Sequence, residues 1–228
     1  MTLLPGRIRR LAALSLTGAL ACGGSAARSA TGTTAPGQAA TAATSAGSLN
    51  RFAAERVMVL PAQSVSGVDP LGWRARAGDE QVLLRRVDST LAAQLGERGL
   101  TQWAFTAALV RAARRNPTYV TDPYQVRALG AIRAAMRSRE QMVLEPVSSQ
   151  LRALAGVSDA RWALVPLEVA FVGDDAGGHV ALSMAIVDVR GTQVRWSGSV
   201  AGARASDYSF AAVESAIHRA ADLVVPRD

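Results

Sequence analysis

Hydrophobic positions in the last third of the chain alternate with polar ones, the period expected of half-buried β-strands. Strands are predicted over residues 161–173, 179–189 and 192–200, separated by turn clusters at 174–178 and 190–191. The side chains expected on the buried faces of these strands are, in order, Val165, Leu167, Val169 and Phe171; Val180, Leu182, Met184 and Ile186; and Val194, Trp196 and Val200. Consecutive strands joined by short turns predict an antiparallel three-strand meander.

The first half of the domain predicts two short strands, at 56–62 and 101–105, around a helix from 79 to 98. Asp79 is the expected cap of this helix, and Gly99 is expected to end it in a left-handed conformation. Leu84, Val87, Leu91 and Leu95 recur at helical spacing and are the expected inner stripe. Residues 63–78 are predicted to form a loop, in which Trp73 covers an edge of the core. This order predicts an early βαβ unit.

Further helices are predicted from capping and stop signals. One runs from Thr106, as its cap, to Arg115, where Asn116 and Pro117 end it. A second starts at Asp122-Pro123 and ends near Arg137. The others span 146–156, with Val147, Leu151 and Leu154 inside, and the segment after Ser209, with Phe210, Val213, Ile217 and Val224 inside. The predicted fold class is α/β (α+β), a mixed β-sheet with covering helices.

The N-terminus has a different pattern, with Arg7, Arg9 and Arg10 before an apolar run from Leu11 to Ala21. A basic start, a short apolar run and small residues at its end are typical of a secretory signal peptide. The run is shorter than the roughly 20 apolar residues of a membrane-spanning helix. We therefore expect residues 1–21 to be a signal peptide.

Cys22 is the only cysteine of the chain and directly follows Ala19-Leu20-Ala21. The segment Gly18 to Cys22 resembles the lipobox of bacterial lipoproteins, although Ala19 stands where Leu is most typical. This resemblance implies that Cys22 is the lipid-attachment residue and that two or three acyl chains anchor the protein. A single acyl chain would bind the membrane only marginally. The resemblance further implies attachment to the outer membrane, if the source has two membranes, because Gly23 stands where an aspartate would retain such a lipoprotein in the inner membrane. The alternative is a plain secreted protein with a thiol beside its cleavage site.

Residues 22–50 are rich in Gly, Ala, Ser and Thr, and Arg28 is their only charged residue. Such a segment lacks the bulky apolar residues needed for a core, so the lipidated cysteine is expected to be followed by a disordered tether. Residues 51–228 then form a single domain. The expected arrangement is a compact domain held away from a bilayer.

Composition narrows the classes of function only slightly. The chain has a formal net charge of +7 and no lysine, so its 25 basic residues are all arginine. Six of them lie in or beside the middle helices: Arg111, Arg114, Arg115, Arg133, Arg137 and Arg139. They either form a face for anionic lipids or acidic partners or are an ordinary solvated helix surface, which we favour. A nucleic-acid partner is not expected, since it conflicts with export and would require a clustered basic face.

The residues that usually carry catalysis or metal binding are sparse. His179 at a predicted turn and His218 on the final helix are the only histidines, too few with Cys22 for a structural zinc site. Asp174 and Asp175 lack the spacing of a calcium loop and are interpreted as turn formers. No Gly-x-Ser-x-Gly elbow or Walker A loop is present. We therefore predict no catalytic, metal or cofactor-binding residue.

The segment from Asp188 to Gly198 resembles the Asp-x-x-Thr-Gly-x-x-x-Trp hairpin of a group of bacterial envelope domains. The group comprises the amino-terminal domain of TolB, the curli-secretion lipoprotein CsgG and the penicillin-binding-protein activator LpoB. Asp188 and Trp196 match in spacing, whereas Gly191-Thr192 reverses the usual order. The apolar strand that ends in Pro61 is also similar. The resemblance covers roughly residues 56–225 and implies a fold, an envelope location and contacts with other proteins, but no catalytic residue.

These inferences together predict a lipid-anchored protein of the bacterial cell envelope, facing the periplasm, with a non-catalytic domain for protein interaction or assembly. Its expected partners are the membrane, through the anchor, and another envelope protein. The alternative is a periplasmic enzyme or a small-ligand-binding protein of unknown chemistry.

Overall fold

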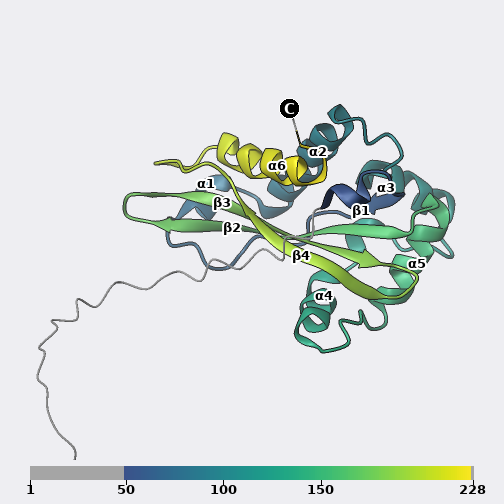
Figure 1. Ribbon diagram of the computed structural model, residues 1–228. Coiled ribbons are helices and arrows are strands. Elements are labelled where there is room, and N and C mark those ends of the chain that lie inside the picture. The colour runs from purple at the N-terminus through teal and green to yellow at the C-terminus, as the bar shows by residue number, and fades with distance from the viewer. Residues whose placement is uncertain (1–48, 227–228) are drawn as a thin grey trace, which may run out of the picture. The chain divides into compact units, whose positions relative to one another are not determined.

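The computed structural model describes residues 49–226 as a four-stranded sheet covered by helices (Figure 1). Its helices are the 3₁₀ turns η1 (Leu49–Phe52) and η2 (Pro123–Gln125) and the α-helices α1 (Trp73–Ala77), α2 (Glu80–Glu97), α3 (Thr106–Arg115), α4 (Ala128–Arg137), α5 (Val147–Ser158) and α6 (Phe210–Val224). Its strands are β1 (Val57–Val59), β2 (Trp162–Asp174), β3 (Gly177–Asp188) and β4 (Gln193–Ala201). Cys22 and the rest of the predicted leader and tether up to residue 48 lie outside the described residues.

The sheet is mixed, with strand order β1-β2-β3-β4. β1 is parallel to β2, whereas β2, β3 and β4 form the antiparallel meander that the alternating pattern predicted. The predicted fold class is thereby confirmed.

Helices cover both faces of the sheet and divide the core into two layers (Figure 1). α2 and α6 pack over one face, where the predicted β3 residues Val180, Leu182, Met184 and Ile186 lie together. α3, α4 and α5 pack over the other face, against Val165 and Leu167 of β2. The three predicted inner residues of α5 are buried there as well.

The sequence prediction that Val165, Leu167, Val169 and Phe171 share one face of β2 is wrong. A bulge between Pro166 and Glu168 shifts the register against β3. An extra residue in one strand reverses the alternation beyond it, because side chains have a period of two. Val169 and Phe171 therefore enter the layer under α2 and α6, opposite to Val165 and Leu167. A second bulge, between Ile186 and Val187, likewise separates Val194 from Trp196.

The predicted strand 101–105 is reduced to one residue. Ala104 forms a single parallel bridge with Met58, so the βαβ arrangement survives only at that point. α3 begins at Thr106, two residues after Ala104, so the segment is too short to form a ladder of hydrogen bonds with β1. Thr106 does not cap α3 as predicted, because its Oγ1 donates to the Val59 carbonyl at 3.1 Å and so fastens α3 to β1.

The helix predicted from Asp122 begins later than expected. Asp122 accepts a hydrogen bond from the Tyr124 backbone N–H, but the turn that it caps is the short η2. α4 starts at Ala128, whose N–H donates to Oε1 of Gln63 at 2.8 Å. A side chain from the loop after β1 thus supplies the cap that the local sequence lacks.

Two smaller predictions also need correction. The buried residue in the first turn of α2 is Leu83 and not Leu84, while the capping role of Asp79 and the left-handed Gly99 are confirmed. The predicted loop 63–78 contains the short helix α1, and its Trp73 is buried in the core.

Gly202 is expected to be intolerant of a side chain. A Cβ at this position would lie 2.9 Å from the Ala216 N and 3.0 Å from the Ala212 O, both backbone atoms of α6. Gly202→Ala should therefore lower the free energy of unfolding by about 1–3 kcal/mol, the usual cost of overpacking. In α4, Gly130 has open space, so Gly130→Ala should raise that free energy by about 0.5–1 kcal/mol. Urea unfolding of both variants measures the two effects. A change of the free energy of unfolding in the same direction for both variants would contradict this prediction.

Candidate functional site

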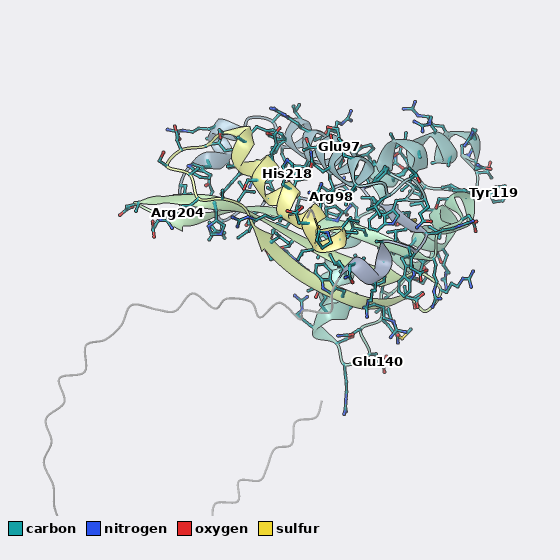
Figure 2. The ribbon with its side chains drawn as sticks, turned by 45° about the horizontal axis from the view of Figure 1, so that its top comes forward. Glu97, Arg98, Tyr119, Glu140, Arg204 and His218 are labelled. Atoms are coloured by element: carbon teal, nitrogen blue, oxygen red, sulfur yellow. The ribbon has the colours of Figure 1, made fainter. Side chains whose placement is uncertain are left out.

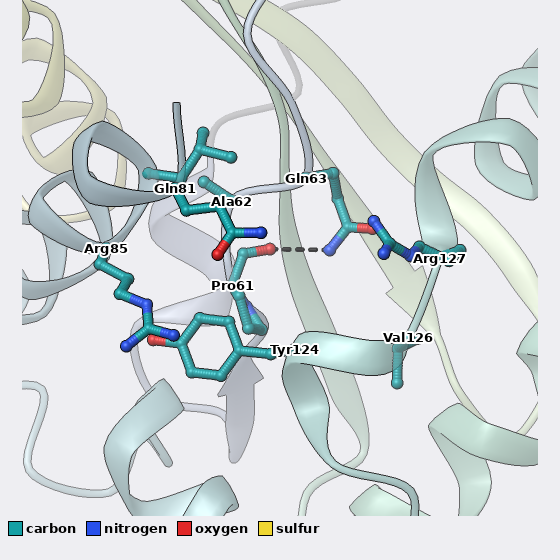
Figure 3. Close-up of a pocket in the computed structure, with 9 residues that line it drawn as sticks. Pro61, Ala62, Gln63, Gln81, Arg85, Tyr124, Val126 and Arg127 are labelled. Carbon is teal, nitrogen blue, oxygen red and sulfur yellow. Dashed lines mark hydrogen bonds between the residues drawn. The ribbon is translucent and has the colours of Figure 1, made fainter. Parts of the chain in front are cut away.

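The candidate site lies where β1 ends and the chain passes between α2 and η2. Leu60 and Gln63 continue beside β2 through hydrogen bonds to the Leu164 and Pro166 carbonyls. The carboxyl end of a parallel strand is a common place for a binding site in α/β folds. Figure 3 shows the side chains that surround this point, with Gln63 turned back to donate to the Pro61 carbonyl at 2.8 Å.

Asp88 of α2 is the central polar residue of the site. Its side chain is buried, with 8% of the residue exposed, and its Oδ1 accepts a hydrogen bond from the Ala62 N–H at 2.7 Å. Its Oδ2 makes no hydrogen bond of ordinary geometry with any described residue. Burial raises the pKa of Asp88 from 3.8 to about 6, and the Ala62 N–H, the Tyr124 hydroxyl and Arg85 oppose this shift to a lesser extent.

Tyr124 of η2 and Arg85 of α2 form the wall above Asp88. The Arg85 guanidinium lies 5.3 Å from the centre of the Tyr124 ring, in the range of a cation–π contact. Burial, followed by the charge of Asp88, raises the pKa of the Tyr124 hydroxyl above its usual value. The hydroxyl therefore stays protonated at physiological pH, and the Asp88 carboxylate is its hydrogen-bond partner.

Two hollows adjoin this wall. The smaller has a volume of about 120 Å³ and is lined by Pro61, Ala62, Gln63, Gln81, Leu84, Arg85, Tyr124, Val126 and Arg127 (Figure 3). The larger, which we call the α2–α3 groove, has a volume of about 370 Å³. It is lined by Arg85, Asp88, Ser89, Ala92, Thr106, Ala107, Val110, Arg111, Arg114 and Tyr124. The groove is the more apolar of the two, because Ala92, Ala107 and Val110 contribute only carbon atoms to it from their side chains.

Positive charge surrounds both hollows. Arg85, Arg111 and Arg114 line the groove and Arg127 lines the smaller hollow. None of these four is within 4.0 Å of a carboxylate among residues 49–226. The buried carboxylate of Asp88 is therefore outnumbered by guanidinium groups that have no acidic partner in the described structure.

The histidines and the aspartate pair that the sequence singled out are not gathered at this site. His179 lies within β3, opposite Val172, and not at a turn as predicted. His218 lies on α6 beside Arg98, whose Nη2 donates to the His218 carbonyl (Figure 2). Asp174 accepts from the Ala176 N–H, in keeping with its predicted turn role, and pairs with Arg204. Among residues 49–226, no three His, Cys, Asp or Glu side chains are grouped as metal ligands.

The six predicted middle arginines do not act as one surface. Arg111 and Arg114 line the groove, while Arg133 pairs with Glu168 of β2 at 2.7 Å. The sequence did contain a signal for Asp88 that was missed. An acid lies next to Val87 and one turn before Leu91, within the apolar stripe of a helix, where a charged residue is almost never buried without a reason.

Comparison of the sequence with protein-family models and with curated proteins finds no match. The structure is similar to the PelC dodecamer from Paraburkholderia phytofirmans, with 15% sequence identity, a TM-score of 0.36, and coverage of 77% of this chain and 91% of that one. It is also similar to the LpoB C-terminal domain from Salmonella enterica, with 14% identity, a TM-score of 0.35, and coverage of 68% and 95%. The E. coli LpoB structure has 15% sequence identity to this chain and a TM-score of 0.35. The match covers 66% of this chain and 57% of that one, so the chain spans little more than half of that protein. At these values the likeness is one of partial architecture, and the function is argued from this chain's own residues.

Proposed function

We propose that this chain is a lipid-anchored protein of a bacterial cell envelope whose domain, residues 51–228, binds another envelope protein without catalysing a reaction. In this proposal residues 1–21 are removed as a signal peptide and Cys22 carries the acyl chains. Residues 22–50 then link the anchor to the domain. The anchor places the domain on the periplasmic side, at the outer membrane if there are two.

The α2–α3 groove is the observation that carries the interaction part of the proposal. It combines an apolar lining, the buried carboxylate of Asp88 and arginines that lack acidic partners among the described residues, the mixture found where an interface excludes water around a few polar anchors. No helix in residues 49–226 is both long and apolar enough to cross a membrane.

The anchor is tested by metabolic labelling with an alkyne fatty acid. The wild-type protein should take up the label, and Cys22→Ser should take up none, because the thiol is the attachment atom. Ser25→Ala, three residues further on, is the matched control and should label like the wild type. An unlabelled wild type, or equal labelling of Cys22→Ser, would overturn the proposed anchor.

The second candidate is a periplasmic enzyme or small-ligand-binding protein, which one observation favours. Asp88 has a pKa raised to about 6, in the range that suits acid–base chemistry, and lies beside a small hollow. Native mass spectrometry of the domain, released from cells under non-denaturing conditions, distinguishes this candidate from the proposed protein-interaction function. A stoichiometric small molecule, lost in Asp88→Asn, would favour this candidate over protein interaction.

A further inference from the structure

A further hollow, with a volume of about 360 Å³, lies beside η1, the first described element of the domain. We call it the η1 hollow. Its lining comes from η1, from the segment that follows it, and from the neighbouring ends of β2, β3 and β4. It shares no residue with the α2–α3 groove or with the smaller hollow beside Tyr124, so it is a separate candidate for ligand binding.

Three arginine side chains line the η1 hollow: Arg51 from η1, Arg161 from the residue before β2, and Arg195 from β4. None of their guanidinium groups donates a hydrogen bond to another residue among 49–226. Arg161 and Arg195 approach Oδ2 of the buried Asp188 at 3.8 and 3.9 Å, which is longer than the roughly 3 Å of an N–H···O hydrogen bond. Their N–H groups therefore remain able to donate to a ligand.

Aromatic rings hold two of these arginines in place. The Arg51 guanidinium lies 4.7 Å from the centre of the Phe52 ring, and the Arg161 guanidinium lies 4.8 Å from that of Trp162. Both distances are typical of cation–π contacts, which use no hydrogen-bond donor. The two rings contact each other edge to face, with their centres 4.9 Å apart. Side chains that are positioned in advance lose less conformational entropy when a ligand binds.

The η1 hollow has a small excess of positive charge. Three arginines face two carboxylates, those of Glu55 and Asp188, which leaves an excess of one positive charge. Both carboxylates already accept hydrogen bonds. Glu55 accepts from Nε1 of Trp162 at 3.3 Å, and Oδ1 of Asp188 accepts from two backbone N–H groups of the turn after β3. The groups that lack partners are thus the arginine donors, and the ligand that matches them is an anion that accepts several hydrogen bonds.

A phosphate monoester fits this arrangement better than a carboxylate. A guanidinium group binds either anion through two parallel N–H···O bonds. A carboxylate offers only two oxygens, whereas a phosphate monoester offers three strong acceptors and more negative charge. We infer that the η1 hollow binds a phosphate monoester, held by Arg161 and Arg195 with Arg51 as the third donor. The phosphate belongs either to a lipid headgroup or to a soluble compound.

Isothermal titration calorimetry with inorganic phosphate and co-sedimentation with vesicles distinguish these two sources. Every protein is the full chain with Cys22→Ser, so that no acyl chain contributes to binding. The vesicles contain phosphatidylcholine alone or mixed with an equal amount of phosphatidic acid, whose headgroup is a phosphate monoester. Heat of binding at about 1 mM inorganic phosphate would indicate a soluble ligand, and binding only to the vesicles with phosphatidic acid would indicate a headgroup. Either result supports the site, and acetate at the same concentration should bind more weakly than phosphate.

Variants of the protein locate the binding. Arg195→Ala should weaken phosphate binding at least about tenfold, because it removes hydrogen bonds between charged groups. Arg195→Lys keeps the charge but not the planar fork, so it should recover only part of that loss. Arg190→Ala is the matched control, since this exposed arginine of the β3–β4 turn lies outside the hollow, and its affinity should equal that of the parent. Glu55→Gln removes a negative charge from the lining and should tighten binding several-fold.

Circular dichroism and urea unfolding confirm that each variant is folded. The inference is overturned if the parent binds neither inorganic phosphate at about 1 mM nor vesicles with phosphatidic acid. Equal affinities of Arg195→Ala and Arg190→Ala would also overturn it, as would equal binding of acetate and phosphate or weaker binding by Glu55→Gln. No partner protein and no acyl chain takes part in these measurements, so their outcome is independent of the function proposed above.

Discussion

Replacement of Asp88 with Asn is expected to remove a pH dependence of about 3 kcal/mol from the stability of the domain. The pKa of Asp88 is raised from 3.8 to about 6 on folding, a difference of about 2 units, and each unit corresponds to about 1.36 kcal/mol. Because the folded protein holds this proton more tightly than the unfolded chain, the free energy of unfolding falls as the pH rises from about 4 to above 6. Above that range the Asp88 carboxylate is charged in both the folded and the unfolded protein, so folding carries the full free-energy cost of burying the charge.

Asparagine preserves the shape and the hydrogen bond that Asp88 accepts from the Ala62 N–H, but it carries no charge. Urea unfolding of both proteins between pH 4 and pH 7.5 gives the comparison. The stability of Asp88→Asn relative to wild type should rise by up to about 3 kcal/mol across this range. Other titrating groups cancel in the difference. Parallel stability curves for the two proteins would contradict the prediction.

A buried charge that lowers stability at neutral pH calls for a reason outside folding. Natural sequences readily accept substitutions that remove such a burden, unless the residue serves a function. Two other charged side chains, Arg98 and Asp188, are also buried, but each has a partner of opposite charge within 4.0 Å. Arg98 pairs with Asp222 of α6, and Asp188 lies near Arg161 and Arg195. The stability measurement on Asp88 therefore supports or weakens the binding role of the groove independently of any ligand.

Phe171→Ala is expected to lower the free energy of unfolding by about 3–5 kcal/mol, the usual loss for a buried phenylalanine. Phe171 is 1% exposed, and its ring makes edge contacts with Trp73 at 6.2 Å and with Tyr208 at 5.8 Å. Its removal leaves a cavity between β2, α1 and the segment before α6. The two remaining aromatic rings cannot close this cavity without moving those elements.

Val172→Ala is the matched control, because this neighbour in β2 points to the opposite side and is 42% exposed. It should cost less than about 1 kcal/mol, since a half-exposed residue leaves no cavity. Urea unfolding at constant pH measures both variants. Similar losses at the two positions would show that the bulge does not turn Phe171 into the core as described.

Most of the helices and strands could be predicted because their signals are local. The meander follows from the alternation of residues 179–189 and from its short turns, and α2 follows from Asp79, its apolar stripe and Gly99. Each of these signals acts within a few residues, where propensity and capping operate. The main part of the fold could be predicted from the sequence for that reason.

The site was less accessible, because its contacts join distant parts of the chain. Asp88 belongs to the site because it accepts a hydrogen bond from the Ala62 N–H and lies beside Tyr124 of η2. Tyr124 belongs to it because its ring contacts Arg85. Only the position of Asp88 within an apolar helical stripe could have indicated the site beforehand.

By itself, the sequence determined the order and type of most elements and the mixed α/β class, and it predicts the leader and Cys22. Only the tertiary structure decided which face each side chain of β2 occupies, since the bulge after Pro166 inverts the alternation. It alone decided where α4 begins, since Gln63 caps it across 65 residues of sequence, and that Asp88 is buried beside the Ala62 N–H and Tyr124. The physical reason is the same in each case: periodicity and capping are short-range properties, whereas burial and hydrogen-bond satisfaction depend on which distant segments meet.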